Sequence, residues 1–273
     1  MSRETLLWIF AVVAILSTSC NQLNEEALKE QSPTTDAESV SEASLQAPAI
    51  PLATAVERVS NWRALKKDQS WWSDNALIAF RIPTTDYKRI KAKGAMGMRA
   101  YMGLSKEGQP QFLLVGVDGS GVDMTNQAEG QFVYNFSQPC PMTCPEISPL
   151  YTGIAPSNAA KVEAPAVGLQ EAVAMTKRWR QTPKDLEWSD DHNFQAFLLP
   201  IEDFIEIAEQ GAAAFRLYLA IDEQGYVTTL LNGVDSEDQD MLDASKGQFI
   251  YAAAAACPAV CDKESPLFAT STH

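Results

Sequence analysis

The stretch MRAYMGL at residues 98–104 returns as FRLYLAI at residues 215–221, and these two segments decide the fold. Both are mainly apolar, and both keep an Arg-x-Tyr pair. A glycine turn and a second apolar run follow each of them, at 112–117 and at 229–234. Two such runs around a short turn containing glycine are typical of an antiparallel β-hairpin.

The two hairpins belong to a longer internal repeat with a spacing of 117 residues. Aligned without a gap, Ala55–Leu150 and Ala172–Leu267 share 35 of 96 positions. This period exceeds that of solenoid repeats and matches the size of a small domain. We therefore expect two tandem copies of one small domain, at 55–151 and 169–268, joined by a linker at 152–168.

Each repeat is expected to hold the same elements in the same order. An amphipathic helix comes first, then a short strand, a second helix that begins after a proline, the hairpin and a last strand. The expected bounds are 55–63 and 172–180 for the first helix, 76–80 and 194–198 for the strand, and 131–134 and 248–251 for the last strand. Gly94 and Gly211 end the second helix. This order indicates an α+β fold, in which each copy is a mainly antiparallel sheet with helices on one face.

Composition allows a packed core and argues against nucleic acid as a partner. The chain has 273 residues, of which 46% are hydrophobic, and its net charge is −14. That apolar content is too high for a disordered chain. An acidic surface repels phosphate backbones, so the charge indicates a solvated surface and no binding of nucleic acid.

The N-terminus resembles a targeting sequence. Leu6–Leu16 is an eleven-residue apolar run, too short to span a membrane and of the length of a signal-peptide core. Ser19 and Cys20 follow, and this arrangement resembles the lipobox of bacterial lipoproteins, although Ser17 stands where that family usually has Leu. The resemblance implies a signal peptide at 1–19 and lipidation of Cys20. Plain secretion with cleavage and a retained anchor are the alternatives.

A tether is expected to separate the lipid from the folded part. Residues 20–54 are rich in Glu, Ser, Thr and Gln and include Pro48 and Pro51, which favour an extended spacer. The resemblance therefore implies a lipid-anchored protein of the cell envelope, outside the cytoplasm, with the membrane as one partner.

Four further cysteines form the sharpest chemical feature. Cys140-Pro-Met-Thr-Cys144 matches Cys257-Pro-Ala-Val-Cys261. In an oxidising compartment, one disulfide within each copy is the simplest interpretation. A tetrahedral Zn²⁺ site built from all four thiolates is a second, and thiol-redox exchange is a third, although the familiar redox motif has two residues between its cysteines.

The Arg-x-Tyr pairs are candidate ligand-binding residues. Arg99 and Tyr101, like Arg216 and Tyr218, share one face of a strand and could grip an anion. Alternatively, each arginine pairs with a local carboxylate, such as Asp86 or Asp203.

The segment Asp118–Asp123 and its counterpart Asp235–Asp240 allow two interpretations. Acidic residues at alternating positions suit a calcium loop, and Asp-Gly is also ordinary turn chemistry. The segments lack the distal Glu of an EF-hand, which favours the turn.

Catalytic residues are not indicated. The two histidines, His192 and His273, have no histidine counterpart in the other repeat, which excludes a repeated His-based mechanism. The sequence contains no phosphate-binding glycine loop and no metalloprotease helix motif. Trp62 lies on an apolar helical stripe and is expected in the core, whereas Trp72 is replaced by Ser189 in the second repeat and is expected at the surface.

Together these observations predict an envelope lipoprotein whose duplicated domain binds an envelope protein or a small ligand. The alternative is a thiol-redox or metal-binding (Zn²⁺ or Ca²⁺) protein that uses the Cys-Pro-x-x-Cys loops. No catalytic residue, cofactor or defined metal site is assigned.

Overall fold

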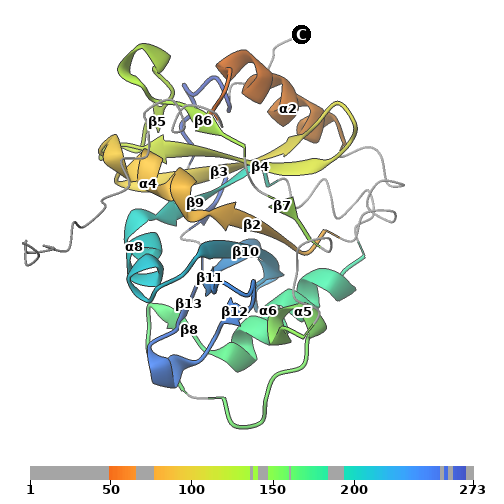
Figure 1. Cartoon of the computed structure of the whole chain (residues 1–273). Coiled ribbons are helices and arrows are strands. Elements are labelled where there is room, and N and C mark those ends of the chain that lie inside the picture. The colour runs from red at the N-terminus through yellow and green to blue at the C-terminus, as the bar shows by residue number, and fades with distance from the viewer. Residues whose placement is uncertain are drawn as a thin grey trace, which may run out of the picture. The chain divides into compact units, whose positions relative to one another are not determined.

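Two antiparallel sheets face each other at the centre of the molecule (Figure 1). The computed structural model describes residues 49–65, 77–135, 138–140, 147–159, 161–183, 194–252, 255–257 and 261–268. All of them belong to one unit within Ser41–His273. The predicted signal peptide, Cys20 and most of the predicted tether lie outside these residues. Within the described ranges, none of the helices combines the length and the hydropathy that crossing a membrane requires.

The first sheet has seven strands. Its order is β1 (Ala49–Ile50), β6 (Val133–Tyr134), β4 (Pro110–Val117), β3 (Gly97–Leu104), β9 (Ala196–Pro200) and β14 (Ala255–Ala256), with β5 (Asp123–Met124) paired to β4.

The second sheet has the equivalent order. It runs β8 (Ala166–Val167), β13 (Ile250–Ala252), β11 (Val227–Val234), β10 (Ala214–Ile221), β2 (Ala79–Pro83) and β7 (Gln138–Pro139), with β12 (Asp240–Met241) paired to β11. The expected hairpins are confirmed as β3–β4 and β10–β11, paired over their whole length.

The two sheets exchange strands between the repeats. β2 and β7 come from the first repeat and lie in the second sheet, where Arg81 is opposite Arg216. Conversely, β9 and β14 come from the second repeat and lie in the first sheet, where Leu198 is opposite Arg99. The ranges 55–151 and 169–268 therefore each supply strands to both sheets.

Helices and 3₁₀ turns complete the fold. They are α2 (Leu52–Leu65), α4 (Thr84–Ala92), α5 (Pro149–Thr152), α6 (Leu169–Gln181), α8 (Ile201–Glu209), η1 (Gln127–Glu129) and η2 (Ala244–Lys246). The expected helix after each proline is confirmed, with Pro83 and Pro200 at the N-caps of α4 and α8. Gly94 and Gly211 follow these helices with positive φ, as expected of helix stops.

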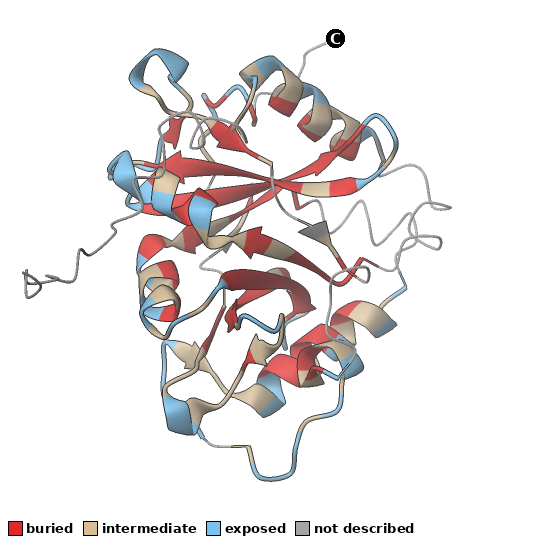
Figure 2. Ribbon diagram, in the orientation of Figure 1, coloured by how far each residue is buried: buried red, intermediate tan, exposed pale blue. Residues whose placement is uncertain are grey.

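The central core lies between the sheets, which buries the inner face of both. The rings of Phe80 on β2 and Phe112 on β4 join the sheets, with centroids 4.1 Å apart. Trp62 belongs to this core, as expected. The α4 and α8 helices close one side of it, where Tyr87 stacks on Phe204 at 5.9 Å. Figure 2 shows the buried strands and the half-buried helices around them.

Outer clusters cover the remaining faces. The α2 helix packs Ala55 and Val59 on the outer face of the first sheet, and α6 packs Ala172 and Val173 on that of the second. The α+β class and the antiparallel sheets are confirmed. The prediction that helices cover one face of a separate sheet in each copy is incomplete. Helices cover the outer face of each sheet, and the other sheet covers its inner face. For this reason every residue of β3 and β10 is buried.

Candidate functional site

A buried polar cluster ties the first repeat to the second sheet. Asp240 on β12 accepts hydrogen bonds from Arg216, from the Tyr218 hydroxyl at 2.5 Å and from Ser148. Asn232 donates to the same carboxylate at 3.1 Å. Ser148 also accepts from Leu150 N and so caps α5. We call Arg216, Tyr218, Asp240 and Ser148 the second Arg–Tyr–Asp cluster.

The electrostatics of this cluster keep its phenol protonated. Arg216 and Tyr218 have no exposed surface. Burial raises the pKa of Tyr218, and the neighbouring Asp240 charge raises it further. A nucleophilic serine needs an adjacent base, but the Ser148 hydroxyl donates to a carboxylate that several other groups already hold. The arrangement therefore stabilises a chain crossing and presents no activated group.

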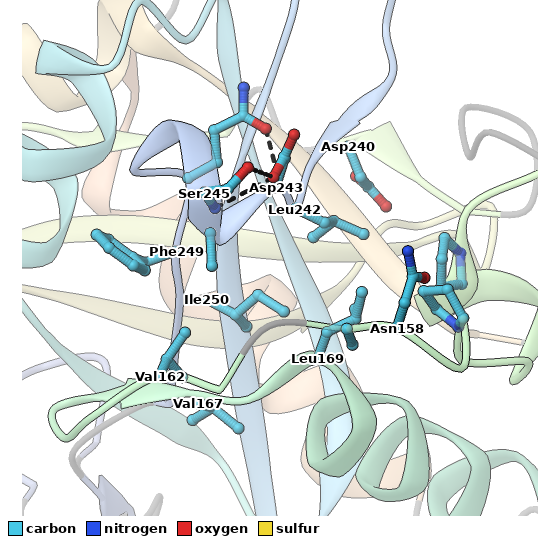
Figure 3. Close-up of a pocket in the computed structure, with 15 residues that line it drawn as sticks. Asn158, Val162, Val167, Leu169, Asp240, Leu242, Asp243, Ser245, Phe249 and Ile250 are labelled. Carbon is cyan, nitrogen blue, oxygen red and sulfur yellow. Dashed lines mark hydrogen bonds between the residues drawn. The ribbon is translucent and has the colours of Figure 1, made fainter.

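A cavity of about 590 Å³, which we call the linker pocket, lies against this cluster (Figure 3). The inter-repeat linker forms one wall and the chain from β12 through η2 to β13 forms the other. Its lining residues are Pro149, Pro156, Asn158, Ala159, Val162, Val167, Leu169, Asp240, Leu242, Asp243, Ala244, Ser245, Gln248, Phe249 and Ile250. Ligand cavities in proteins typically have such a volume and such a mixed lining.

Polar groups in the linker pocket retain hydrogen-bonding capacity. Asp243 accepts from the Ser245 hydroxyl at 2.6 Å and pairs with Lys246 at 3.0 Å. Gln248 uses its carbonyl oxygen to accept from Asp243 N at 3.0 Å. Among the described residues, the side-chain amide nitrogens of Gln248 and Asn158 have no hydrogen-bond partner. The lining contains two carboxylates and no cationic side chain, so the pocket suits neutral or cationic molecules.

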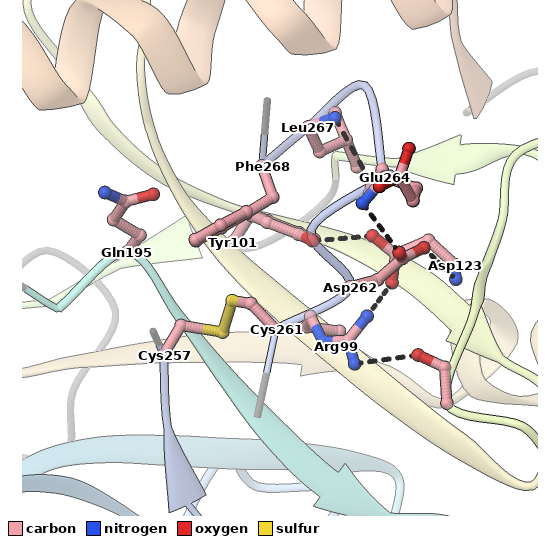
Figure 4. The surroundings of a disulfide bond; sticks show 12 residues. Arg99, Tyr101, Asp123, Gln195, Cys257, Cys261, Asp262, Glu264, Leu267 and Phe268 are labelled. Carbon is pink, nitrogen blue, oxygen red and sulfur yellow. Dashed lines mark hydrogen bonds and ion pairs between the residues drawn. A yellow bond between two sulfur atoms is a disulfide. The ribbon is translucent and has the colours of Figure 1, made fainter. Parts of the chain in front are cut away.

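An equivalent cluster lies in the first sheet, next to a disulfide (Figure 4). Asp123 on β5 accepts from Arg99 and from the Tyr101 hydroxyl at 2.5 Å. Burial raises the pKa of Asp123, against the opposing effects of Arg99, Ser265 and Tyr101. Ser265 comes from the second repeat, so the two Ser-Pro-Leu segments cross in opposite directions. We call this set the first Arg–Tyr–Asp cluster.

The Arg-x-Tyr residues thus bind carboxylates of the chain itself. Arg99 is 1% exposed and Arg216 is 0% exposed. Their partners are Asp123 and Asp240, and not the suggested Asp86 and Asp203, because β5 and β12 turn back onto the same strand face.

The acidic segments form turns. Asp118 accepts from the backbone N–H groups of Ser120 at 2.8 Å and Val122 at 3.0 Å, and Asp235 makes the equivalent bonds in the second repeat. The last acid of each segment, Asp123 or Asp240, is the buried arginine partner. Among the described residues, no group of three His, Cys, Asp or Glu side chains could hold a metal ion.

The cysteine loops anchor to opposite sheets. Cys257 and Cys261 form a disulfide, with their Cα atoms 5.2 Å apart, and Cys257 packs beside Tyr101. Cys140 is also disulfide-bonded and packs beside Tyr218. Cys144 lies outside the described residues, as do Trp72, His192 and His273.

Two features of the site escaped sequence reasoning: the serines of the Ser-Pro-Leu motifs and the linker pocket. The repetition of Ser148 and Ser265 in both copies was the available signal for the serines. Comparison with protein-family models, with curated proteins and with solved structures finds no match.

Proposed function

We propose that the protein is a lipid-anchored binding protein of the cell envelope that holds a small ligand in the linker pocket. The observation that carries the proposal is the cavity of about 590 Å³, with its mixed lining and the side-chain amide nitrogens of Gln248 and Asn158, which have no partner among the described residues. The absence of cations from its lining favours a neutral or cationic ligand with an apolar part.

The anchor and the duplication complete this proposal. Cys20 carries the lipid, the tether runs from residue 20 to the start of β1 at Ala49, and two copies of one unit form the body. The identity between the repeats and the equivalent strand orders of the sheets support the duplication. The inter-repeat linker occurs once, so the pocket belongs to the second sheet alone.

A matched pair of linker variants tests the pocket. Ala159 lines it, whereas Ser157, two residues earlier, is exposed and does not. Ala159→Trp should fill the cavity and Ser157→Trp should leave it open. N-phenyl-1-naphthylamine, a neutral aromatic amine that fluoresces in apolar surroundings, is a suitable probe. We expect saturable fluorescence with the wild type and with Ser157→Trp, and its loss with Ala159→Trp.

Native mass spectrometry of protein purified from its own membrane gives an independent result. A small-molecule adduct should accompany the wild type and Ser157→Trp and be missing from Ala159→Trp. Equal probe binding by all three proteins, with no adduct in any of them, would remove the pocket from the proposal.

A further inference from the structure

A second groove, of about 730 Å³, lies at the edge of the first sheet, away from the linker pocket. It runs between the C-terminal end of α4, strand β1 and the segment from η1 to β6. Its lining residues are Ala49, Ile50, Pro51, Arg89, Ala92, Lys93, Gln127, Ala128, Gly130, Phe132 and Tyr134. We call it the α4 groove. Its lining has two cations and no carboxylate, the reverse of the linker pocket.

The polar end of the α4 groove, at Tyr134 and Arg89, lacks a carboxylate that the second repeat has at the equivalent place. Tyr251 on β13 donates a hydrogen bond at 2.5 Å to the carboxylate of Glu206 on α8. At the equivalent positions, 117 residues earlier, the first repeat has Tyr134 and Arg89. The tyrosine is kept, but the helix no longer supplies a carboxylate. Among the described residues, the Tyr134 hydroxyl has no hydrogen-bond partner.

Charge at this end favours an anion. Burial raises the pKa of Tyr134; the Arg89 charge opposes this rise, and the Asp86 charge adds to it to a smaller extent. Lys93, the C-cap residue of α4, is exposed, and its Nζ lies beside Gly130. The second repeat has neutral Gln210 there. Arg89 also lies 3.8 Å from the buried Asp86 and lines the groove as well.

The remainder of the α4 groove is apolar. Ile50 and Phe132 are partly buried side chains packed against the cores, and Ala49 and Ala92 complete the wall. A ligand that fits both ends has one negative group and a short hydrocarbon portion.

We infer that the α4 groove binds an organic carboxylate. Its carboxylate takes the place that Glu206 fills in the second repeat, accepts from the Tyr134 hydroxyl and pairs with Arg89 and Lys93. Its hydrocarbon part lies on Ile50 and Phe132. On a chain of net charge −14, such a local pair of cations is what allows an anion to approach.

Calorimetric titration of the full chain in a neutral detergent tests this site, with blank titrations into detergent alone. The probes are hexanoate, as a free aliphatic acid, and N-acetyl-leucine, as a stand-in for a peptide C-terminus, with hexanol as the uncharged control. We expect one saturable site for at least one of the carboxylates and none for hexanol. Whichever carboxylate binds more tightly identifies the source.

Substitutions copied from the second repeat serve as variants, because they are tolerated in the equivalent place. Arg89→Glu should weaken carboxylate binding by about tenfold or more, since Tyr134 then gains an internal carboxylate. Lys93→Gln should weaken it by about twofold to fivefold. The control Glu206→Gln should leave binding unchanged, and so should Ala159→Trp, because it fills the other cavity.

The inference is overturned if neither carboxylate saturates, if hexanol binds as tightly as hexanoate, or if Arg89→Glu binds both acids like the wild type. Retention of carboxylate binding by Ala159→Trp separates this outcome from any failure of the linker pocket.

Discussion

Ser148 donates a hydrogen bond to the carboxylate of Asp240, which lies 92 residues further along the chain. The contact joins the end of the first repeat to the second sheet, and Ser265 makes the reciprocal approach to Asp123. Each Ser-Pro-Leu segment therefore connects one repeat to the sheet of the other, and it follows a cysteine loop in the sequence. We call this serine–aspartate contact the clasp.

We expect Ser148→Ala to lower the free energy of unfolding by about 1–3 kcal/mol, because the buried Asp240 loses one of its donors. Ser265→Ala should have a similar effect. Denaturant titration followed by tryptophan fluorescence measures both, and the exposed Ser157→Ala is the matched control. A loss no greater than that of Ser157→Ala would mean that the clasp contributes no stability.

Removal of either cluster arginine should be more damaging. Arg216→Met leaves the Asp240 carboxylate buried without its counter-ion, and we expect a loss of about 3–5 kcal/mol. The double variant Arg216→Met with Asp240→Asn should recover part of this loss, since the uncompensated charge is gone. A double-mutant cycle measures the coupling, and strict additivity of the two effects would contradict an ion pair.

Asp86 should make stability depend on pH. Its side chain is fully buried, and burial raises its pKa from 3.8 to about 7 against the opposing effects of Arg89 and Thr85. At a pH well below 3.8 the Asp86 carboxyl is protonated in the folded and the unfolded state, so it does not change the free energy of unfolding. As the pH rises from about 4 to about 7, the unfolded state alone loses the proton, so stability falls.

The variant Asp86→Asn removes this slope. Relative to the wild type, we expect it to gain on the order of 2–4 kcal/mol between pH 4 and pH 8, measured as the difference in unfolding free energy at each pH. Asp203, whose pKa is raised to about 6 by burial and by Glu206 and Glu202, is unchanged in both proteins and cancels. A difference that is constant with pH would show that Asp86 titrates normally.

One repeat by itself should not fold as a monomer. A chain of residues 49–168 has β3 and β4 but lacks β9, whereas its own β2 has no β10 to pair with. Two such chains can satisfy each other by the exchange seen within the full protein. We expect a dimer or an unfolded chain by light scattering, and a folded monomer would contradict this expectation.

The mass of the protein isolated from its membrane tests the N-terminal and cysteine predictions together. We expect an acylated chain beginning at Cys20, which gains the mass of four hydrogens on reduction, two for each disulfide. Cys20→Ala should release the protein from the membrane fraction. An unmodified chain that starts elsewhere would contradict the lipid anchor.

The sequence by itself determined the local elements and their order. The apolar runs at 98–104 and 112–117 form a hairpin, Pro83 begins a helix and Gly94 ends it, because these outcomes depend on neighbours in the chain. The repeat also predicts equivalent elements in both halves, and the two sheets have equivalent strand orders.

Only the tertiary structure decided which piece joins which sheet. β2 and β9 share Ala-Phe and Pro, so each suits either hairpin, and no local pattern distinguishes the two pairings. Likewise, the sequence alone indicates that Asp123 and Asp240 are turn residues. In the folded chain, β5 and β12 place them next to Arg99 and Arg216. Both cavities lie where segments distant in sequence contact each other. Tertiary packing decides these contacts, because the periodicity of a sequence shows only which face of an element is apolar. It does not show which other element covers that face.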